Sequence, residues 1–498
     1  MEEYFLVLDC GATSLRSIAI SPQGEILAAS SLPNQPRPQD ERSEWLVWDI
    51  EEIWQKICEN TRRVVNGFPG KVLGVAVTTF GADGAPVTKD GHLTYPVISW
   101  QCSRTVPWVE KIASLMKPRE IFRLTGYQII PFNTLLKILW LRENAPSALD
   151  QAYSFMMLPG ILNFRLTGEM SVDYTSLSTG MMLDISRRCL AEELLSLAGI
   201  STRFFPRFVE AGEVIGTVSK RASQETGIPE GVPVVSAGHD TQFAIVGSMA
   251  GEGEVILSSG TWEIAALRIP YYRDSEIAFR TGMLVELDAE KGLWNPQMLM
   301  IAGGVVEWVR RNFFAEAKDQ KDIYDLMVEQ AQHVSPGAQG IFVVPAFMPS
   351  GPTRPYGTKG TILGLSLTTS RAQVFRATLE GLSFQLKQAI LALQEAFHFE
   401  PRGVRVVGGG AKNKLWNQIR ADVTGLPVVT TSCEEATVLG AALFTMVGVG
   451  YARSLDEAKK NIRIKTHLWE PSLNREKYQL LFEQYEKLPR LLQDHYCQ

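Results

Sequence analysis

The chain alternates apolar strand-like segments with amphipathic helix-like segments along its whole length, and this alternation limits the folds open to it. The segment "KVLGVAVTTFG" has the continuous apolar run of a buried strand. The segment "DIEEIWQKICENTRRVV" places Ile50, Ile53, Trp54 and Ile57 on one helical face, with Asp49 before them as an N-cap. Strands that alternate with helices predict an α/β protein.

Length and charge narrow the class of protein further. The 498 residues exceed what one hydrophobic core usually supports, so we expect two or three domains. A net charge of −5 without a basic cluster argues against nucleic acid or an anionic membrane as partner. No apolar run reaches the roughly 18 residues of a membrane span, and the start "MEEYFLVLDCG" goes straight into a strand, so we expect no signal peptide. The six isolated cysteines indicate a reducing compartment, so we expect a cytoplasmic protein.

The opening stretch "LVLDCGATSLRSIAI", residues 6–20, contains the first candidate site. An apolar strand ends on Asp9, a glycine and hydroxyl turn follows, and a second strand begins near Ser17. A plain hairpin needs such a turn, but it does not need an acid at the end of its first strand. Backbone N–H groups and hydroxyls suit phosphate oxygens, and the carboxylate suits a cation or its waters. Both the hairpin and the metal–phosphate interpretation stay open here.

A faint internal repeat extends this interpretation. Residues 254–267, "EVILSSGTWEIAAL", again read as strand, glycine–threonine turn and strand, and "GVAVTTFGADG" is matched by "VRVVGGGAKN". Two similar lobes that present such turns to a shared cleft would hold one polyphosphate from both sides. Chance similarity between two α/β domains is the alternative.

Three acids and bases follow strand ends, where open α/β sheets bind their ligands. His239 and Asp240 follow "VPVVS", and Asp240 is either a helix cap or the general base of a phosphoryl transfer. Asp83 in "TFGADGAP" is either a turn residue or a hook for a substrate hydroxyl. Trp100 and Arg104 are candidates for the wall of a sugar pocket.

The segment "VVGGGAKNKLWNQIRADVTG", residues 406–425, predicts a strand, a glycine run and a helix that ends at Gly425. It matches neither GxGxxG nor GxxxxGK[ST], so a Rossmann or Walker A site is not supported. Consecutive glycines still allow a base or a phosphate to approach the backbone closely.

Five motifs follow one another along the chain: "LDCGATSLR", "GHDTQ", "SSGTWE", "VVGGGAKNKLWNQIRADV" and "EATVLGAAL". In this order they resemble the FGGY carbohydrate kinases of the actin-like ATPase superfamily, and the resemblance covers nearly the whole chain. The resemblance implies two actin-like (ribonuclease H-like) α/β lobes around a central ATP and sugar cleft. It implies a sugar- and phosphate-binding lobe at 1–247, a nucleotide-binding lobe at 248–452 and a helical tail at 453–498.

The resemblance also implies residue roles. Asp240 matches the catalytic base of the family. Asp9 would bind, through water, the Mg²⁺ that accompanies ATP. The expected contacts of ATP and its phosphates are Asp9, Gly11, Ala12, Thr13, Ser14, Arg16, Gly260, Thr261, Gly408, Gly409, Gly410 and Asn413. The expected sugar site comprises Gly81, Asp83, His239 and Asp240, together with the pocket candidates Trp100 and Arg104.

Within the family, the segments "GVAVTTFGADGAPV", "YPVISWQCSRT" and "AGHDTQFAIVG" are most similar to kinases of L-fuculose, and kinases of L-rhamnulose come next. The expected reaction is ATP-dependent phosphorylation of a ketose at O1. Alternative substrates are L-rhamnulose, D-ribulose and D-xylulose. Alternative classes of protein are an actin-like ATPase switch and a sugar-sensing regulator. The regulator would need a DNA-binding segment, and no basic helix-turn-helix segment is evident. The expected partners are a ketose and ATP, and a homodimer is compatible with them.

Overall fold

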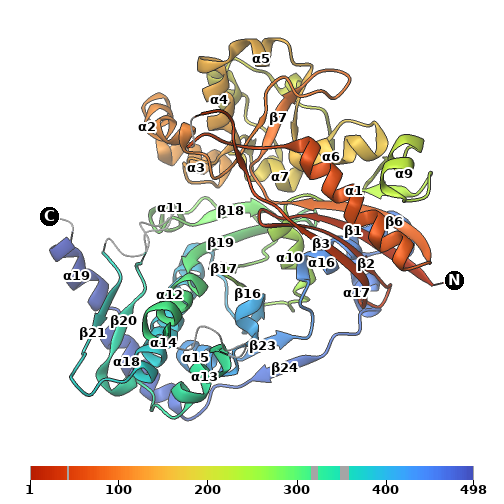
Figure 1. Ribbon diagram of the computed structural model, residues 1–498. Helices are drawn as coiled ribbons and strands as arrows, with labels where there is room; N and C mark the ends of the chain where they lie inside the picture. Colours follow the sequence, from red (N-terminus) through yellow and green to blue (C-terminus); the bar gives the residue numbers. More distant parts are fainter. Residues whose placement is uncertain (1, 42–43, 316–322, 348–357, 497–498) are drawn as a thin grey trace.

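A computed structural model of the chain describes residues 2–41, 44–315, 323–347 and 358–496, and its two halves are each built around one sheet (Figure 1). The sheet of the N-terminal half has the strand order β14 (Val214–Thr217), β15 (Pro233–Val235), β6 (Lys71–Thr79), β1 (Glu3–Cys10), β2 (Ser14–Ile20) and β3 (Ile26–Pro33). The sheet of the C-terminal half has the order β18 (Leu284–Leu287), β19 (Trp294–Ile301), β17 (Trp262–Ala266), β16 (Glu254–Ser259), β22 (Gly403–Val407), β23 (Val428–Thr431) and β24 (Thr466–Trp469).

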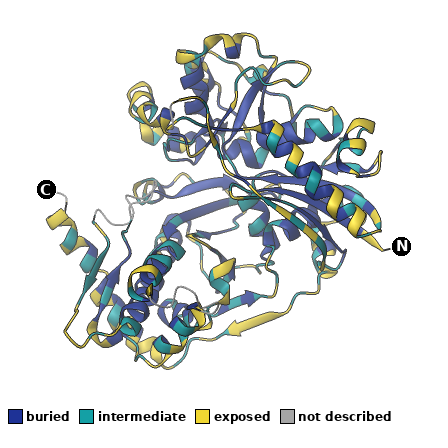
Figure 2. Ribbon diagram, in the orientation of Figure 1, coloured by how far each residue is buried: buried dark blue, intermediate teal, exposed yellow. Residues whose placement is uncertain are grey.

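Helices and short strands surround these sheets. The N-terminal half adds α1 (Ile50–Gly67), α2 (Val106–Leu115), α3 (Pro118–Thr125), α4 (Thr134–Asn144), α5 (Pro146–Asp150), α6 (Leu158–Thr167), α7 (Tyr174–Ser178), α8 (Glu192–Leu197), α9 (Lys220–Thr226), β4 (Arg37–Pro38), β5 (Leu46–Trp48), β7 (Gly84–Val87), β8 (Val97–Ile98), β9 (Ser154–Met157), β10 (Ser171–Asp173), β11 (Leu183–Asp184), β12 (Cys189–Leu190) and β13 (Arg207–Val209). The C-terminal half adds α11 (Glu276–Arg280), α12 (Gly303–Phe313), α13 (Ile323–Gln332), α14 (Arg371–Phe397), α15 (Lys414–Thr424), β20 (Phe342–Val344) and β21 (Thr361–Leu363). Figure 2 shows that the central strands are buried, whereas the outer helix faces are exposed.

The two sheets share one central arrangement. In the first, β1 pairs antiparallel with β2 and parallel with β6. In the second, β16 pairs antiparallel with β17 and parallel with β22. Each sheet therefore holds a hairpin whose first strand is flanked by a parallel neighbour, which is the repeat that the sequence predicts. In the first sheet this register aligns Thr78, Asp9 and Arg16 across three adjacent strands.

Two helices at the junction of the halves cross at very short range. A Cβ atom on Gly247, in α10 (Asp240–Gly247), would lie 1.9 Å from the carbonyl oxygen of Ala436. A Cβ atom on Gly440, in α16 (Ala436–Gly448), would lie 1.9 Å from that of Phe243. The small residues of "EATVLGAAL" thus permit a close helix crossing between the two sheets (Figure 1).

The end of the chain is helical only in part. It forms α17 (Leu455–Lys460), then the strand β24, and then α18 (Asn474–Tyr485) and α19 (Leu488–Tyr496). Because β24 pairs antiparallel with β23, this segment completes the second sheet in addition to providing helices. In the part of the chain that the structure describes, no helix is both long and apolar enough to span a bilayer.

Candidate active site

The first glycine turn places its acid between two polar partners. Asp9 lies near the end of β1, and its Oδ1 atom accepts a hydrogen bond of 2.8 Å from the Thr78 hydroxyl. The Arg16 guanidinium bonds to Oδ2 of Asp9, with Nε at 3.0 Å, and also pairs with Glu435 from the C-terminal half. The Gly11 N–H donates to the Ser14 carbonyl at 2.9 Å and closes the turn. The turn therefore joins both halves of the chain through Arg16.

The second glycine turn is backed by a helix N-terminus. Gly260 closes the β16–β17 turn by donating to the Trp262 carbonyl. The N–H groups of Gly303 and Gly304, at the start of α12, donate to the carbonyls of Gly260 and Thr261 at 3.1 and 3.0 Å. A Cβ atom on Gly303 would lie 2.3 Å from the Gly260 oxygen, so the contact requires glycine. This support was not predicted from the sequence, in which its only local signal is the Gly-Gly pair.

The glycine run after β22 packs against the same turn. Gly408 has φ +86°, and a Cβ atom on Gly410 would lie 2.0 Å from the Ser259 hydroxyl oxygen. The Asn413 carboxamide oxygen accepts from the Trp416 N–H at 3.0 Å and caps α15, which ends at Gly425 as predicted. The run therefore reaches the β16–β17 turn.

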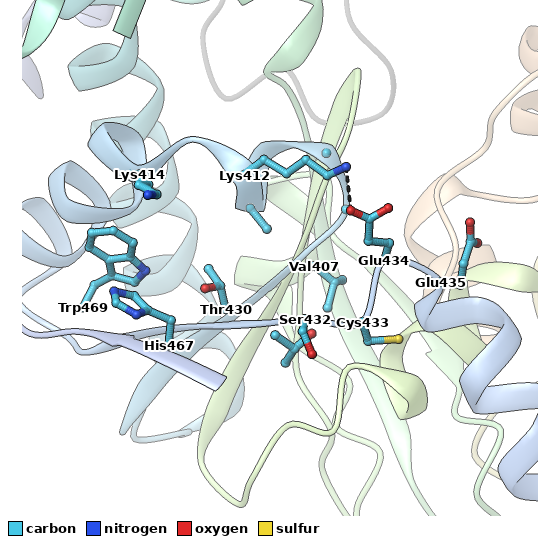
Figure 3. A pocket seen from close by; sticks show the side chains of 14 residues that line it. Val407, Lys412, Lys414, Thr430, Ser432, Cys433, Glu434, Glu435, His467 and Trp469 are labelled. Carbon is cyan, nitrogen blue, oxygen red and sulfur yellow. Dashed lines mark ion pairs between the residues drawn. The ribbon is translucent and has the colours of Figure 1, made fainter. Parts of the chain in front are cut away.

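A groove opens beside Gly408 and Gly409 (Figure 3). Its walls come from the ends of β22, β23 and β24 and from the loop before α16. Lys412 and Glu434 form an ion pair of 2.8 Å at its rim. On the opposite wall, the ring centroids of His467 and Trp469 lie 4.4 Å apart. The groove thus combines charged and aromatic side chains.

Asp240 begins α10, directly after His239. Its carboxylate accepts from the Thr241 N–H, and the Nε2 atom of His239 lies 3.4 Å from Oδ1. Removal from bulk water and the charge of Asp9 raise the pKa of Asp240, against the opposing effects of His239 and Thr241. A recessed carboxyl with a raised pKa suits proton transfer near neutral pH.

A small cavity lies next to His239 in the N-terminal half. Its lining residues are Phe80, Gly81, Ala82, Trp100, Tyr127, Phe132, Thr179 and His239. Three residues of the predicted sugar site, Gly81, Trp100 and His239, are therefore brought together. Tyr127, Phe132 and Thr179 were missed, because they stand alone in segments without a motif.

Asp83 and Arg104 lie behind this lining. The buried Asp83 carboxylate accepts from the Trp48 indole N–H at 2.6 Å and from the Trp100 backbone N–H at 3.0 Å, and it forms an ion pair with Lys137. Burial raises the pKa of Asp83 and lowers that of Lys137, against their mutual attraction. Asp83 thus supports the backbone of Trp100 from behind. A direct hydroxyl contact by Asp83 stays a prediction.

Arg104 is enclosed by aromatic rings. Its guanidinium carbon lies 4.8 Å from the Trp45 ring centroid and 4.9 Å from that of Trp140, and it donates to the Gln39 side chain at 2.8 Å. These contacts occupy a side chain that the sequence placed in a pocket wall, so its sugar contact also stays a prediction.

Comparison with known proteins identifies the family. The model of the FGGY carbohydrate kinase N-terminal domain matches residues 4–247, and that of the C-terminal domain matches residues 255–449. An L-fuculokinase of Escherichia coli K12 is 40% identical over 471 residues, which cover 94% of this chain and 98% of that protein. An L-fuculokinase of Haemophilus influenzae is 35% identical over 91% of this chain and 97% of that protein.

Solved structures agree at the level of the fold. A xylulose kinase from Rhodospirillum rubrum superposes with a TM-score of 0.88 at 21% identity, covering 99% of this chain and 100% of that one. A glycerol kinase of Plasmodium falciparum with ADP gives a TM-score of 0.87 at 20% identity, covering 99% and 98%. The predicted actin-like α/β fold is confirmed. The chain belongs to the FGGY family of carbohydrate kinases.

Proposed function

We propose that this carbohydrate kinase transfers the γ-phosphoryl group of ATP to O1 of L-fuculose, giving L-fuculose 1-phosphate and ADP. The choice of sugar is supported by L-fuculokinases that are 35–40% identical over more than nine-tenths of the chain. The observation that supports the chemistry is the position of Asp240: it does not itself line the cavity, but its carboxylate lies 3.4 Å from Nε2 of the cavity residue His239.

In the proposed step, the ketose O1–H lies against the Asp240 carboxylate. The bond from O1 to the γ-phosphorus forms while the bond from that phosphorus to the β–γ bridging oxygen breaks, and ADP leaves with the electron pair. The O1 proton passes to Asp240 late, because an alcohol is too weak an acid to ionise before phosphorus is attacked. Orientation of O1 and charge stabilisation then supply most of the acceleration.

The nucleotide would lie across the two turns and the glycine run. We assign its phosphates to Asp9, Arg16 and the turn residues Gly11, Ala12, Thr13 and Ser14 on one side, and to Gly260 and Thr261 on the other. Gly408, Gly409, Gly410 and Asn413 would border the nucleoside. The first N–H groups of α12 are bonded to the carbonyls of Gly260 and Thr261, so the helix acts on this site through the positive end of its dipole, which favours an anion near the second turn.

The residues present suit Mg²⁺ held mainly by the nucleotide. No group of three or more His, Cys, Asp or Glu side chains forms a metal cage within the described residues. Mg²⁺ usually keeps several waters and binds one or two carboxylates plus substrate phosphates. Asp9, close enough to Asp240 for their charges to interact, offers that kind of donor. When bound with ATP, Mg²⁺ would neutralise charge on the phosphates.

The remaining assignments complete the proposal. His239, Gly81 and Trp100 would contact the ketose, and Asp83 and Arg104 would act on it mainly through the residues they support. The chain would divide into lobes at 1–247 and 248–452 with a C-terminal segment at 453–498.

Coupled measurement of ADP release with a panel of ketoses tests the substrate. We expect kcat/KM for L-fuculose to exceed that for L-rhamnulose by at least about tenfold, because the two sugars differ in hydroxyl configuration and buried polar groups would distinguish the two configurations. A preference for L-rhamnulose, D-ribulose or D-xylulose would replace the substrate but keep the reaction. ADP release that no sugar stimulates would contradict both.

The variant Asp240→Asn tests the base. We expect kcat to fall by at least about 100-fold while ATP binding is retained, because the amide cannot accept the O1 proton. A kcat near that of the wild type would remove Asp240 from this role.

A further inference from the structure

One strand of the C-terminal half reaches the wall of the candidate sugar cavity. This strand, β18, is the end strand of the second sheet. The Val285 N–H donates to the Gly126 carbonyl at 2.8 Å, and the Leu287 N–H donates to the Ser178 hydroxyl at 2.9 Å. Both acceptors belong to the N-terminal half. The side chain between these two contacts is Glu286.

The Glu286 carboxylate is buried among groups of the N-terminal half, with its side chain only 2% exposed. The Tyr127 hydroxyl donates to Oε1 at 2.9 Å, and the Gln242 amide donates to Oε2. The Nδ1 atom of His239 lies 3.4 Å from Oε2. Among the residues that the structure describes, His239 is the only basic side chain within 4.0 Å of this carboxylate. Tyr127 and His239 also line the cavity.

We propose that Glu286 is a positioning residue that receives the Nδ1–H of His239 and thereby directs Nε2 towards Asp240 and the cavity. This inference rests on the proposed function of Asp240. The Nδ1 atom is buried and makes no hydrogen bond within the usual geometric limits, so Glu286 is the acceptor that faces it. Contacts of this kind are often long in an unliganded site and shorten when substrate binds.

The surroundings of His239 hold the ring in this orientation. A Cβ atom on Gly81 would lie 2.9 Å from both Cδ2 and Nε2 of the imidazole, so the ring packs directly on the glycine. The His239 backbone N–H donates to the Thr175 hydroxyl at 2.9 Å. The ring therefore has its Cδ2 and Nε2 atoms next to Gly81, Nε2 at 3.4 Å from Asp240 and Nδ1 towards Glu286.

The charges around His239 give the arrangement a chemical consequence. Burial alone would lower the pKa of the imidazole, but Glu286 from β18, Asp240 from α10 and Asp173 from β10 outweigh it and raise that pKa. Burial would raise the pKa of Glu286, but the neighbouring His239 imidazole, together with the hydrogen bonds from Tyr127 and Gln242, lowers it. An ionised Glu286 thus favours a charged His239, which in turn helps to keep the neighbouring Asp240 ionised and able to accept a proton.

The variant Glu286→Gln tests this chain of effects, because glutamine keeps the size of the side chain but removes its charge. We expect the His239 pKa, followed by ¹⁵N NMR of the labelled imidazole, to fall. We expect the acid limb of the pH profile of kcat/KM for the ketose to move to higher pH, and kcat/KM at neutral pH to fall about tenfold, the scale for losing the partner that orients a functional histidine. The KM for ATP should stay unchanged.

The matched control is Asp288→Asn, two residues further along the same strand end. Asp288 is buried and accepts from Arg268 at 2.7 Å and from Asn295 at 2.8 Å. Asp288→Asn removes a buried negative charge that does not contact His239. The His239 pKa and the acid limb of the pH profile of kcat/KM should therefore stay unchanged. A His239 titration that does not move in Glu286→Gln, or that moves equally in Asp288→Asn, overturns the proposal.

A second variant keeps the test decisive if Glu286→Gln does not fold. Tyr127→Phe removes one donor to Glu286 and leaves its charge, so the His239 pKa should rise, opposite to the shift in Glu286→Gln. An unchanged or lowered His239 pKa in Tyr127→Phe contradicts the proposal. The NMR measurement needs no sugar, so it distinguishes failure of this inference from failure of the proposed substrate.

Discussion

The two hairpin turns carry the same kind of pair, an acid with an arginine, in different surroundings. At the first turn, the Asp9 side chain is 6% exposed and that of Arg16 is 27% exposed, and Arg16 also contacts Glu435. At the second turn, the ion pair of Glu263 and Arg420 is sealed, with side chains 1% and 0% exposed. The arginine of the first pair can therefore reach solvent, whereas that of the second cannot.

The difference separates ligand binding from support. An arginine that stays in contact with solvent can exchange a partner for an incoming anion at little cost in stability. A buried pair cannot lose one member without leaving a charge unpaired. Arg420 also donates to the Ser259 hydroxyl at 2.8 Å and lies 3.5 Å from the Gly410 carbonyl, so it ties the second turn to the glycine run. We infer that Arg16 is available to a ligand and that Arg420 holds the scaffold.

The largest expected effect is on the sealed pair. Glu263→Gln should lower the free energy of unfolding by about 3–5 kcal/mol, because Arg420 remains buried without its counter-charge. Thermal and urea denaturation would measure the loss. Combining Glu263→Gln with Arg420→Met should recover part of it. If Glu263→Gln is as stable as the wild type, Arg420 does not depend on Glu263 as its counter-charge.

At the open pair, the larger effect should be on activity. Asp9→Asn should lower kcat/KM for ATP by about 100-fold, since a carboxylate beside the proposed phosphate site is lost, while the fold is retained. Initial rates with ATP, Mg²⁺ and ketose varied in turn would measure this. A variant whose only defect is a raised KM for the ketose would place Asp9 on the wrong side of the site.

The glycine run contains a matched pair of positions. A Cβ atom on Gly410 would lie 2.0 Å from the Ser259 oxygen that Arg420 holds, whereas a Cβ atom on Gly409 would meet nothing within 4 Å. Gly410→Ala should therefore cost about 1–3 kcal/mol of stability through overpacking, and Gly409→Ala should cost less. Melting temperatures of the two variants test this. If the nucleoside borders Gly409, its alanine variant should still raise the KM for ATP.

Local patterns in the sequence were enough to predict the strands, the turns and the family. The run that ends on Asp9 and the glycines near 408–410 each form within about ten residues, so their structure follows from local propensity and turn chemistry. Asp240 and His239 were named because they follow a strand end, whereas Gly81 was assigned to the sugar site only through the resemblance to the family. The α/β fold with one sheet in each half follows from the alternation of these segments.

Contacts between distant segments could not be predicted. Glu286 meets Tyr127 and His239 only because β18 crosses to the other half of the chain. Its sole local signal is an acid within the apolar strand "LVEL". Likewise, "GADG" gives no sign that Lys137 and Trp48 close around Asp83. Such partners are fixed by tertiary packing, which a local pattern does not record.

The smallest expected effect concerns Glu435, the second partner of Arg16, which also lines the groove of Figure 3. Its side chain is 32% exposed, so its loss should change stability by less than about 1 kcal/mol. If Arg16 binds phosphate, Glu435 competes with the nucleotide for the guanidinium. Glu435→Gln should then lower the KM for ATP about two- to threefold, most clearly at low salt.

The neighbour Glu434 provides the control for this change. The Glu434 side chain is 69% exposed and pairs with Lys412 at 2.8 Å, and within the described residues it forms no ion pair with Arg16. Glu434→Gln therefore removes the same charge from the same loop without changing the partners of Arg16. Its KM for ATP should change less than that of Glu435→Gln. If both variants change KM equally, the effect is the general field of the loop. If Glu435→Gln instead raises the KM for ATP, Glu435 holds Arg16 in place for the phosphates. The carboxylate next to Arg16 then supports its arginine, as Glu263 supports Arg420.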